Sequence, residues 1–163
     1  MAFTAVMMTQ YTNNLGTKAI NMSTDSFRVI LLTAATTGLA AAQDTMATMT
    51  DVKAVTGFTE LATSVGGSNY TQNANSTSSG QALVSPTWTR AGHVWTFDAA
   101  DPVWTTAGSA FNPAYAVFFD STGGTDATNL PICWWDFGGA QLGTGGNYTL
   151  TIAATGIVTA TSS

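Results

Sequence analysis

Few side chains in this sequence could carry out chemistry, and their spacing favours no common catalytic site. The one histidine, His93, has no serine or cysteine partner signature, so a nucleophilic triad is not supported. The one cysteine, Cys133, lies in an apolar run, and we expect it to be a small buried residue rather than a nucleophile. No internal disulfide can form with a single cysteine.

Four aspartates near the ends of expected strands could supply oxygen ligands to a calcium ion. They are Asp98, Asp101, Asp120 and Asp136. The interval between Asp98 and Asp101 is not specific for calcium, and aspartates in turns before Pro or Gly need no metal. Glycoside hydrolysis requires paired carboxylates, but the only glutamate, Glu60, lies far from these aspartates in the sequence. We therefore expect no catalytic residue, no metal and no cofactor.

Two short stretches match parts of catalytic motifs by coincidence. Asp136-Phe137-Gly138 spells the metal-binding tripeptide of protein kinases, but the rest of that signature is absent. The glycines between residues 143 and 146 do not form a phosphate-binding loop, because no Gly-Lys-Ser/Thr follows them. Neither stretch indicates an enzyme.

Five tryptophans could stack on sugar rings, although in a β protein they more often fill the core. They are Trp88, Trp95, Trp104, Trp134 and Trp135. Because Trp134 and Trp135 are adjacent in an expected strand, they must face opposite sides of it. If one belongs to the core, the other lies either beneath a second layer or in an interface. The pair is therefore the strongest pointer in the sequence to an assembly contact.

Residues 112–138 are the stretch around which the rest of the chain is expected to be organised. Two runs of aromatic and branched residues flank a polar, Gly-rich connection, which is typical of two strands and a loop. Neither run is cleanly polar on one side, so we expect both faces to be covered. This pair should form the centre of the fold.

The remaining elements are shorter and are separated by turn residues. A helix is expected over residues 5–15, ended by Gly16. Strands are expected over 27–34, 81–90 with a break at Pro86, 93–98, 103–105, 148–153 and 157–161, with a hairpin turn at Ala91-Gly92. Residues 35–50 could form either a weak helix over 40–49 or a long surface loop. Residues 52–62 could hold a short strand. Residues 63–80 are rich in Asn, Ser, Thr and Gly and should form an exposed polar loop.

This pattern predicts a single all-β domain over residues 1–163. We expect an antiparallel β-sandwich or barrel with a short N-terminal helix or arm over residues 1–20 and long polar loops. Charged residues are only 8% of the chain, but 45% are hydrophobic and 10% aromatic, which excludes the composition of a disordered protein. The surface should be neutral and rich in hydroxyl groups.

The charge pattern and the first residues exclude several classes of partner. The net charge is −5 with only four lysines and arginines, so no basic patch for nucleic acid is expected. No apolar run approaches the length of a membrane span. The N-terminus lacks the basic region of a signal peptide, so we expect synthesis in a cytoplasm without export by a standard route.

Several landmarks along the chain together resemble a group of small virion proteins of tailed bacteriophages. The matching stretches are Leu15-Gly16, residues 24–32, residues 94–104, residues 115–120, residues 130–138 and residues 156–159. The chain departs from the group in its long Thr-, Ser- and Asn-rich segments at 35–50 and 63–80. The resemblance implies a non-enzymatic structural protein of the virion, and no site residues carry over from it.

We therefore expect a capsid decoration (cement) protein that binds the outer surface of the assembled shell. Its partners would be the major capsid protein lattice and copies of itself, with no nucleic acid and no membrane. The expected contacts are the segment 1–12, the loop 63–80 and an exposed member of the tryptophan pair, represented by Phe3, Tyr11, Asn69, Tyr70, Trp134 and Trp135. The alternatives are a tail or fibre component, or a carbohydrate-binding module that uses exposed tryptophans.

Overall fold

The computed structural model describes residues 4–33, 37–62, 70, 72, 79–106, 111–141 and 146–161. Ten strands and three short helices lie in this part of the chain, and all strand pairs are antiparallel, so the all-β prediction is confirmed. The strands are β1 Thr4–Met7, β2 Phe27–Leu32, β3 Gln81–Ala82, β4 Thr87–Ala91, β5 Val94–Asp98, β6 Val103–Thr106, β7 Tyr115–Asp120, β8 Leu130–Asp136, β9 Gly146–Thr149 and β10 Val158–Thr161. The helices are α1 Thr9–Gly16, α2 Thr37–Ala42 and α3 Met49–Lys53.

Strands β7 and β8 lie inside the largest sheet, whose order is β1-β8-β7-β2-β3. Five consecutive residues in each of these two strands are buried, so both faces of the sheet are covered, as the mixed apolar pattern predicted. Phe118 pairs with Cys133 and Phe119 with Pro131, so a bulge falls between these two pairs. The central position expected for residues 112–138 is confirmed.

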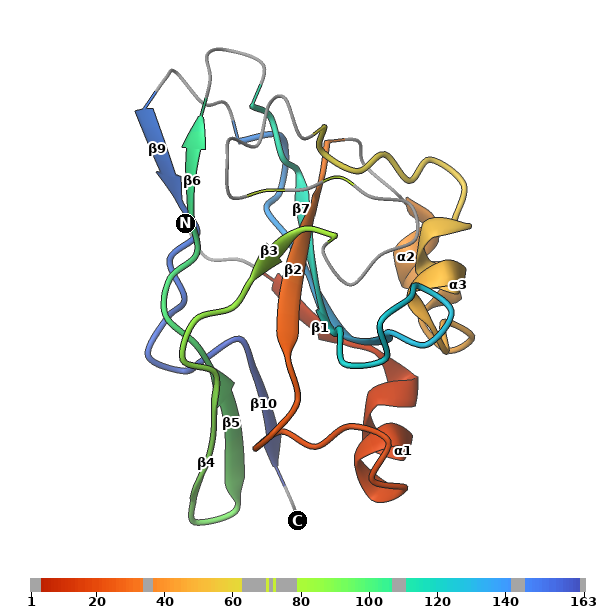
Figure 1. Ribbon diagram of the computed structural model, residues 1–163, viewed down its shortest axis with the longest axis vertical. Coiled ribbons are helices and arrows are strands. Elements are labelled where there is room, and N and C mark those ends of the chain that lie inside the picture. Colours follow the sequence, from red (N-terminus) through yellow and green to blue (C-terminus); the bar gives the residue numbers. More distant parts are fainter. Residues whose placement is uncertain are drawn as a thin grey trace.

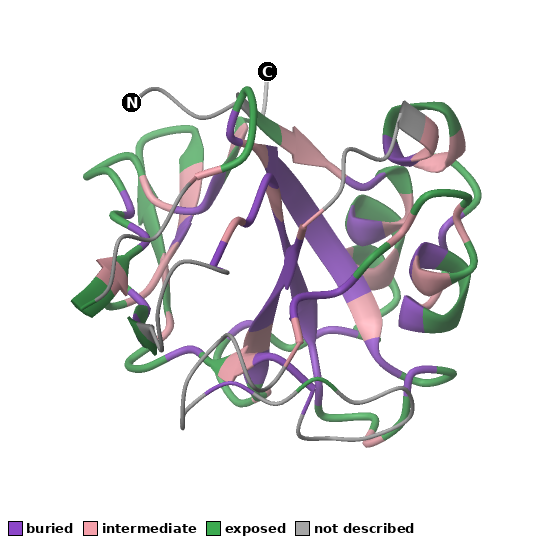
Figure 2. Ribbon diagram, turned by 90° about the horizontal axis from the view of Figure 1, so that it is seen from above, coloured by how far each residue is buried: buried purple, intermediate pink, exposed green. Residues whose placement is uncertain are grey.

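Two smaller sheets accompany the large one, with orders β10-β5-β4 and β6-β9. Figures 1 and 2 show helices α2 and α3 on one side of the large sheet and strands β4, β5, β6 and β9 on the other. The deepest burial runs along the large sheet between these two sides (Figure 2). No helix in the described part of the chain is long and apolar enough to cross a membrane.

Helix α3 is docked onto the loop that joins β7 to β8. Thr48 and Asp51 form a reciprocal capping box that fixes the start of the helix. The Met49 amide donates to the carbonyl of Asn129 at 2.9 Å, and the Thr50 amide donates to the carbonyl of Asp126 at 3.0 Å. These bonds hold the first residues of α3 against a loop that is distant in the sequence.

Three local predictions were wrong, each because of a contact distant in the sequence. Residues 4–7 form an edge strand paired with β8, and the helix begins only at Thr9. Residues 49–53 are helical, and the expected strand at 52–62 is reduced to one bridge between Leu32 and Glu60. The strand expected at 148–153 ends at Thr149, after which the Ile152 amide donates to Oδ1 of Asp101 at 2.8 Å.

Candidate functional site

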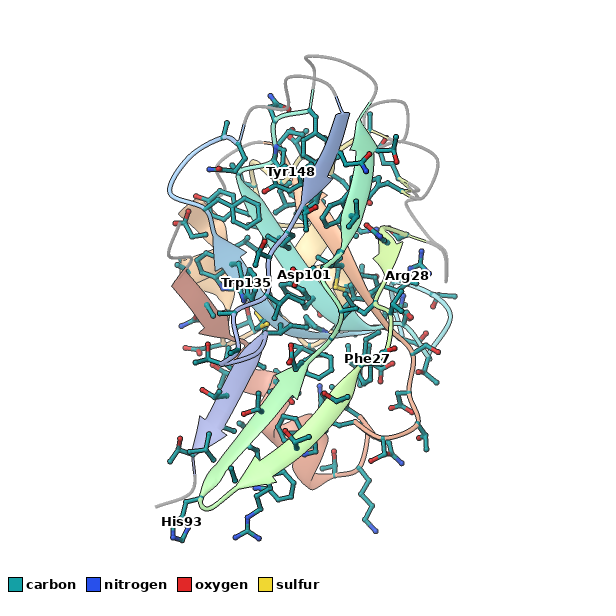
Figure 3. All side chains as sticks on the ribbon, turned by 90° about the vertical axis from the view of Figure 1, so that its left-hand side faces the viewer. Phe27, Arg28, His93, Asp101, Trp135 and Tyr148 are labelled. Atoms are coloured by element: carbon teal, nitrogen blue, oxygen red, sulfur yellow. The ribbon has the colours of Figure 1, made fainter. Side chains whose placement is uncertain are left out.

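A hairpin made of β4 and β5 extends from the body of the protein. The predicted hairpin is confirmed, but its turn lies one residue later than predicted, at Gly92-His93: Ala91 pairs with Val94, and Gly92 has a φ of 60°. Figure 3 shows His93 at the tip of this hairpin, far from the labelled core residue Trp135. The hairpin therefore carries its side chains into solvent or towards a partner.

Two tryptophans and an arginine form a stack on one face of the hairpin. The rings of Trp88 and Trp95 are 5.5 Å apart and within 11° of parallel, and the Arg90 guanidinium carbon lies 5.5 Å from the Trp95 ring centroid. Both indoles are half-buried and Arg90 is exposed, whereas Phe97 deeper on the same face is buried against Phe27. The stack links the apolar core to the surface.

A shallow pocket adjoins this stack. It has a volume of about 430 Å³ and is lined by Trp88, Lys18, Asn21, Ser23, Leu15, Ile20 and Met22. The lining places an indole and an ammonium beside amide and hydroxyl groups. Such a combination can hold an apolar ring and an adjoining anionic group.

The cations of the chain divide into two internal and two exposed residues, and all four lie in the described part. Arg28 donates to the carbonyls of Ser79 and Gly80 at 2.7 and 2.8 Å, and burial lowers the pKa of its guanidinium. Lys53 is bound to two carboxylates. Lys18 and Arg90 are exposed: Arg90 belongs to the stack, and Lys18 lines the adjoining pocket together with Trp88. We call Lys18, Trp88, Arg90, His93 and Trp95 the hairpin surface.

A second group of polar residues is enclosed between α3, the β7–β8 loop and β2. The Lys53 ammonium lies 2.9 Å from Oδ2 of Asp126 and 3.5 Å from Oε2 of Glu60, and it donates to Oγ of Ser79 at 3.2 Å. Ser79 and Tyr70 each donate a hydroxyl hydrogen bond of 3.2 Å to Oε1 of Glu60. We call Lys53, Glu60, Tyr70, Ser79 and Asp126 the ion cluster.

The ion cluster is sheltered from water but not sealed. The side chains of Lys53, Glu60 and Asp126 are 14%, 7% and 3% exposed. Burial raises the pKa of Glu60, although Lys53 and the hydroxyl groups of Ser79 and Tyr70 oppose that rise. Asp126 also has one buried carboxylate oxygen, Oδ1, without a hydrogen-bond partner in the described structure.

Most of the contact residues expected from the sequence lie in the interior, and that expectation is corrected. Tyr11 and Tyr70 are 0% and 1% exposed, and Trp134 and Trp135 are 6% and 4% exposed. None of these four can be a surface contact of the folded chain. Phe3 and Asn69, like most of the loop 63–80, lie outside the described residues.

The tryptophan pair is buried because both faces of β8 are covered. Trp135 donates from Nε1 to the carbonyl of Ile157 at 3.0 Å and packs against Phe118. Trp134 lies against Tyr115, with ring centroids 5.9 Å apart. Of the two alternatives for this pair, a second layer or an interface, the second layer is therefore correct. The partly exposed indoles of the protein are those of Trp88 and Trp95.

The four aspartates considered for calcium are separate in the structure. All four accept a hydrogen bond from a backbone amide: Asp98 from that of Ala99, Asp101 from that of Ile152, and Asp136 from that of Gly138. The fourth, Asp120, accepts from the amide of Thr122. Within the described ranges, no three His, Cys, Asp or Glu residues are grouped so that they could hold a metal ion.

No protein-family model, no curated protein and no solved structure matches this chain.

Proposed function

We propose that this protein is a non-enzymatic structural protein of a tailed-phage virion that decorates the outside of the assembled capsid. The observation that carries the proposal is the hairpin surface. Half-buried indoles on one face of a three-stranded sheet are the kind of residue that dominates the binding energy of protein interfaces. The partner is the major capsid protein lattice.

The distribution of charge supports binding through the hairpin surface. The chain carries a net charge of −5, yet its two exposed Lys and Arg side chains, Lys18 and Arg90, both lie at the hairpin surface. A positively charged end on an acidic protein orients it towards an acidic patch during encounter. We therefore propose that the hairpin surface meets a negatively charged area on the shell.

The repeating shell would strengthen a weak single contact. We propose that the protein binds as a homo-oligomer, because several hairpin surfaces held together can engage neighbouring capsid subunits at the same time. Avidity of this kind needs no extensive interface on each copy. Formation of a homo-oligomer also suits this chain, because its few charges give little electrostatic repulsion between copies.

The test is sedimentation of the purified protein with empty shells. We expect the wild-type protein to sediment with shells, and Trp95→Ala or Arg90→Ala to weaken this binding at least tenfold. Val103→Ala is the matched control, since Val103 is 36% exposed and lies on β6, outside the hairpin surface. Protein that ignores shells but is found in purified tails would instead support a tail component.

A carbohydrate-binding module is a second candidate, favoured by the partly exposed indoles of Trp88 and Trp95. Aromatic rings beside amide and hydroxyl groups can stack on sugar faces, and the adjoining pocket offers Asn21 and Ser23. Sugar-dependent quenching of tryptophan fluorescence, lost in Trp88→Ala, would favour this reading over capsid binding.

A further inference from the structure

An amine and a carboxyl group are held in contact within the ion cluster. Nζ of Lys53 lies 2.9 Å from Oδ2 of Asp126, whose side chain is 3% exposed. Oε2 of Glu60 lies 3.5 Å from the same nitrogen. A nucleophile, an acyl carbon and a proton carrier are thus brought together by three distant segments.

We propose that Lys53 and Asp126 condense to an intramolecular isopeptide bond, with Glu60 carrying the proton. Fixing two reactants in contact replaces a bimolecular encounter with a far more probable internal one. A neutral amine is the form that attacks an acyl carbon, and Oδ2 of Asp126, 2.9 Å from the Lys53 nitrogen, is placed to accept the proton that the ammonium must lose. The geometry provides both conditions at one place.

The reaction is a balanced condensation. The Lys53 ammonium first passes a proton to Asp126, which gives a neutral amine and a carboxylic acid. The amine nitrogen then bonds to Cγ of Asp126 and loses a proton to the Glu60 carboxylate. Glu60 returns that proton to the hydroxyl on Cγ, the C–O bond breaks, and one water molecule leaves. One positive and one negative charge disappear together, so the net charge of the chain does not change.

The surroundings of Glu60 suit the role of a proton carrier. Ser79 and Tyr70 both donate hydrogen bonds to Oε1, which leaves Oε2 on the side of the Lys53 nitrogen. Burial raises the pKa of Glu60 and so makes its protonated form easier to reach. A shallow pocket of about 520 Å³, lined in part by Lys53, Glu60 and Gln72, gives the released water a path out.

The bond would join helix α3 to the β7–β8 loop. The two residues are 73 positions apart, so the link would close a large part of the chain. With one buried cysteine, the protein has no disulfide for this purpose. An isopeptide bond would supply a covalent restraint that does not depend on the redox state of its surroundings.

Intact-mass spectrometry of the folded, purified chain tests the bond directly. We expect the wild-type mass to be lower than its sequence mass by one water molecule. Lys53→Arg and Asp126→Ala should each have their full sequence mass, because neither can form the amide. A wild-type mass equal to the full sequence mass would overturn the proposal, whether or not the variants fold.

Trypsin locates the link within the chain. In the wild type, cleavage after Lys53 should be blocked, and residues 29–90 should remain attached to residues 91–163 after cleavage at Arg90. In Lys53→Met the two fragments should separate. If the mass deficit is present but separate fragments 29–53 and 54–90 are recovered, the bond lies elsewhere and the assignment is wrong.

A third variant tests the role given to Glu60. Glu60→Gln keeps the size of the side chain but cannot take up and return the proton, so most of the folded variant should keep its full sequence mass. Circular dichroism establishes that the variant is folded before its mass is compared. Complete loss of water in Glu60→Gln would show that Glu60 is not the proton carrier.

Discussion

The indole rings of Trp88 and Trp95 lie 5.5 Å apart and almost parallel, although the two residues belong to different strands of a protruding hairpin. Their positions are diagonal across β4 and β5, because Trp88 pairs with Phe97 and Trp95 with Arg90. Diagonal neighbours in an antiparallel pair are within reach of long aromatic side chains. This arrangement leaves two indoles partly exposed in a protein that buries its other three.

We expect Trp95→Ala to cost less stability than Trp104→Ala. Trp104 is 0% exposed, and removing a fully buried indole should lower the free energy of unfolding by about 3–5 kcal/mol. Trp95 is half-buried, so its loss should cost about 1–2 kcal/mol. Urea unfolding of both variants measures the difference. Equal losses would mean that the hairpin is part of the core.

Lys53→Met should be strongly destabilising. The substitution prevents the proposed isopeptide bond and leaves the buried carboxylates of Glu60 and Asp126 without the Lys53 nitrogen that both contact, and removing one partner of a buried ion pair in this way costs about 3–5 kcal/mol. Lys18→Met is the matched control, because Lys18 is exposed and its replacement should change stability by less than about 0.5 kcal/mol. Similar unfolding midpoints for the two variants would contradict the importance of the ion cluster.

Stability should fall as the pH rises through the range in which Asp120 titrates. Burial raises the pKa of Asp120 from its ordinary 3.8 to about 6; nearby Asp25 adds to this rise, while hydrogen bonds from Thr122 oppose it. The folded carboxyl therefore keeps its proton between about pH 4 and 6, where the unfolded one has lost it. This stabilisation is complete below about pH 4 and is lost above about pH 6, with a total of at most about 3 kcal/mol.

Comparison with Asp120→Asn isolates this effect. Glu60, whose pKa is also raised, contributes a slope of the same sign, so the difference between wild type and variant is the informative quantity. The asparagine can still accept the hydrogen bond from the Thr122 amide. Urea unfolding from pH 4 to pH 7 should show a shallower decline in the variant. Parallel curves would show that Asp120 has an ordinary pKa.

Two glycines with positive φ should respond differently to alanine. Gly80 has a φ of 72°, and a Cβ atom there would lie 2.2 Å from the carbonyl oxygen of Val29, so Gly80→Ala should disturb the pairing of β3 with β2. Gly92 has a φ of 60° with nothing within 4 Å of the added atom, so Gly92→Ala should cost only the strain of about 1–2 kcal/mol. Thermal unfolding of both variants measures the contrast, and a Gly80→Ala variant as stable as Gly92→Ala would contradict it.

The centre of the fold could be predicted from the sequence because its signals are local. The aromatic and branched runs at β7 and β8 lack a polar face, which indicated two covered sides. The hairpin turn could be predicted from Gly92. By contrast, the spacing of Val6, Tyr11 and Leu15 fits a helix, and only the pairing of β1 with β8 makes residues 4–7 a strand.

The candidate sites were harder to predict because their residues are distant in the sequence. Lys53, Glu60 and Asp126 have no motif spacing, and only the docking of α3 on the β7–β8 loop brings them together. The signal available in the sequence was the scarcity of charge. With 8% charged residues, a buried lysine has few carboxylates with which it can pair. The hairpin surface could have been found by writing out the register around Gly92, which sets Arg90 opposite Trp95.

The most direct test of capsid decoration is the sedimentation of this protein with empty shells, measured together with its mass in solution. We expect a stable oligomer that sediments with shells, and we expect Trp95→Ala to remain in the supernatant while Val103→Ala sediments as the wild type does. A monomer that stays in the supernatant at every shell concentration would contradict the proposed function.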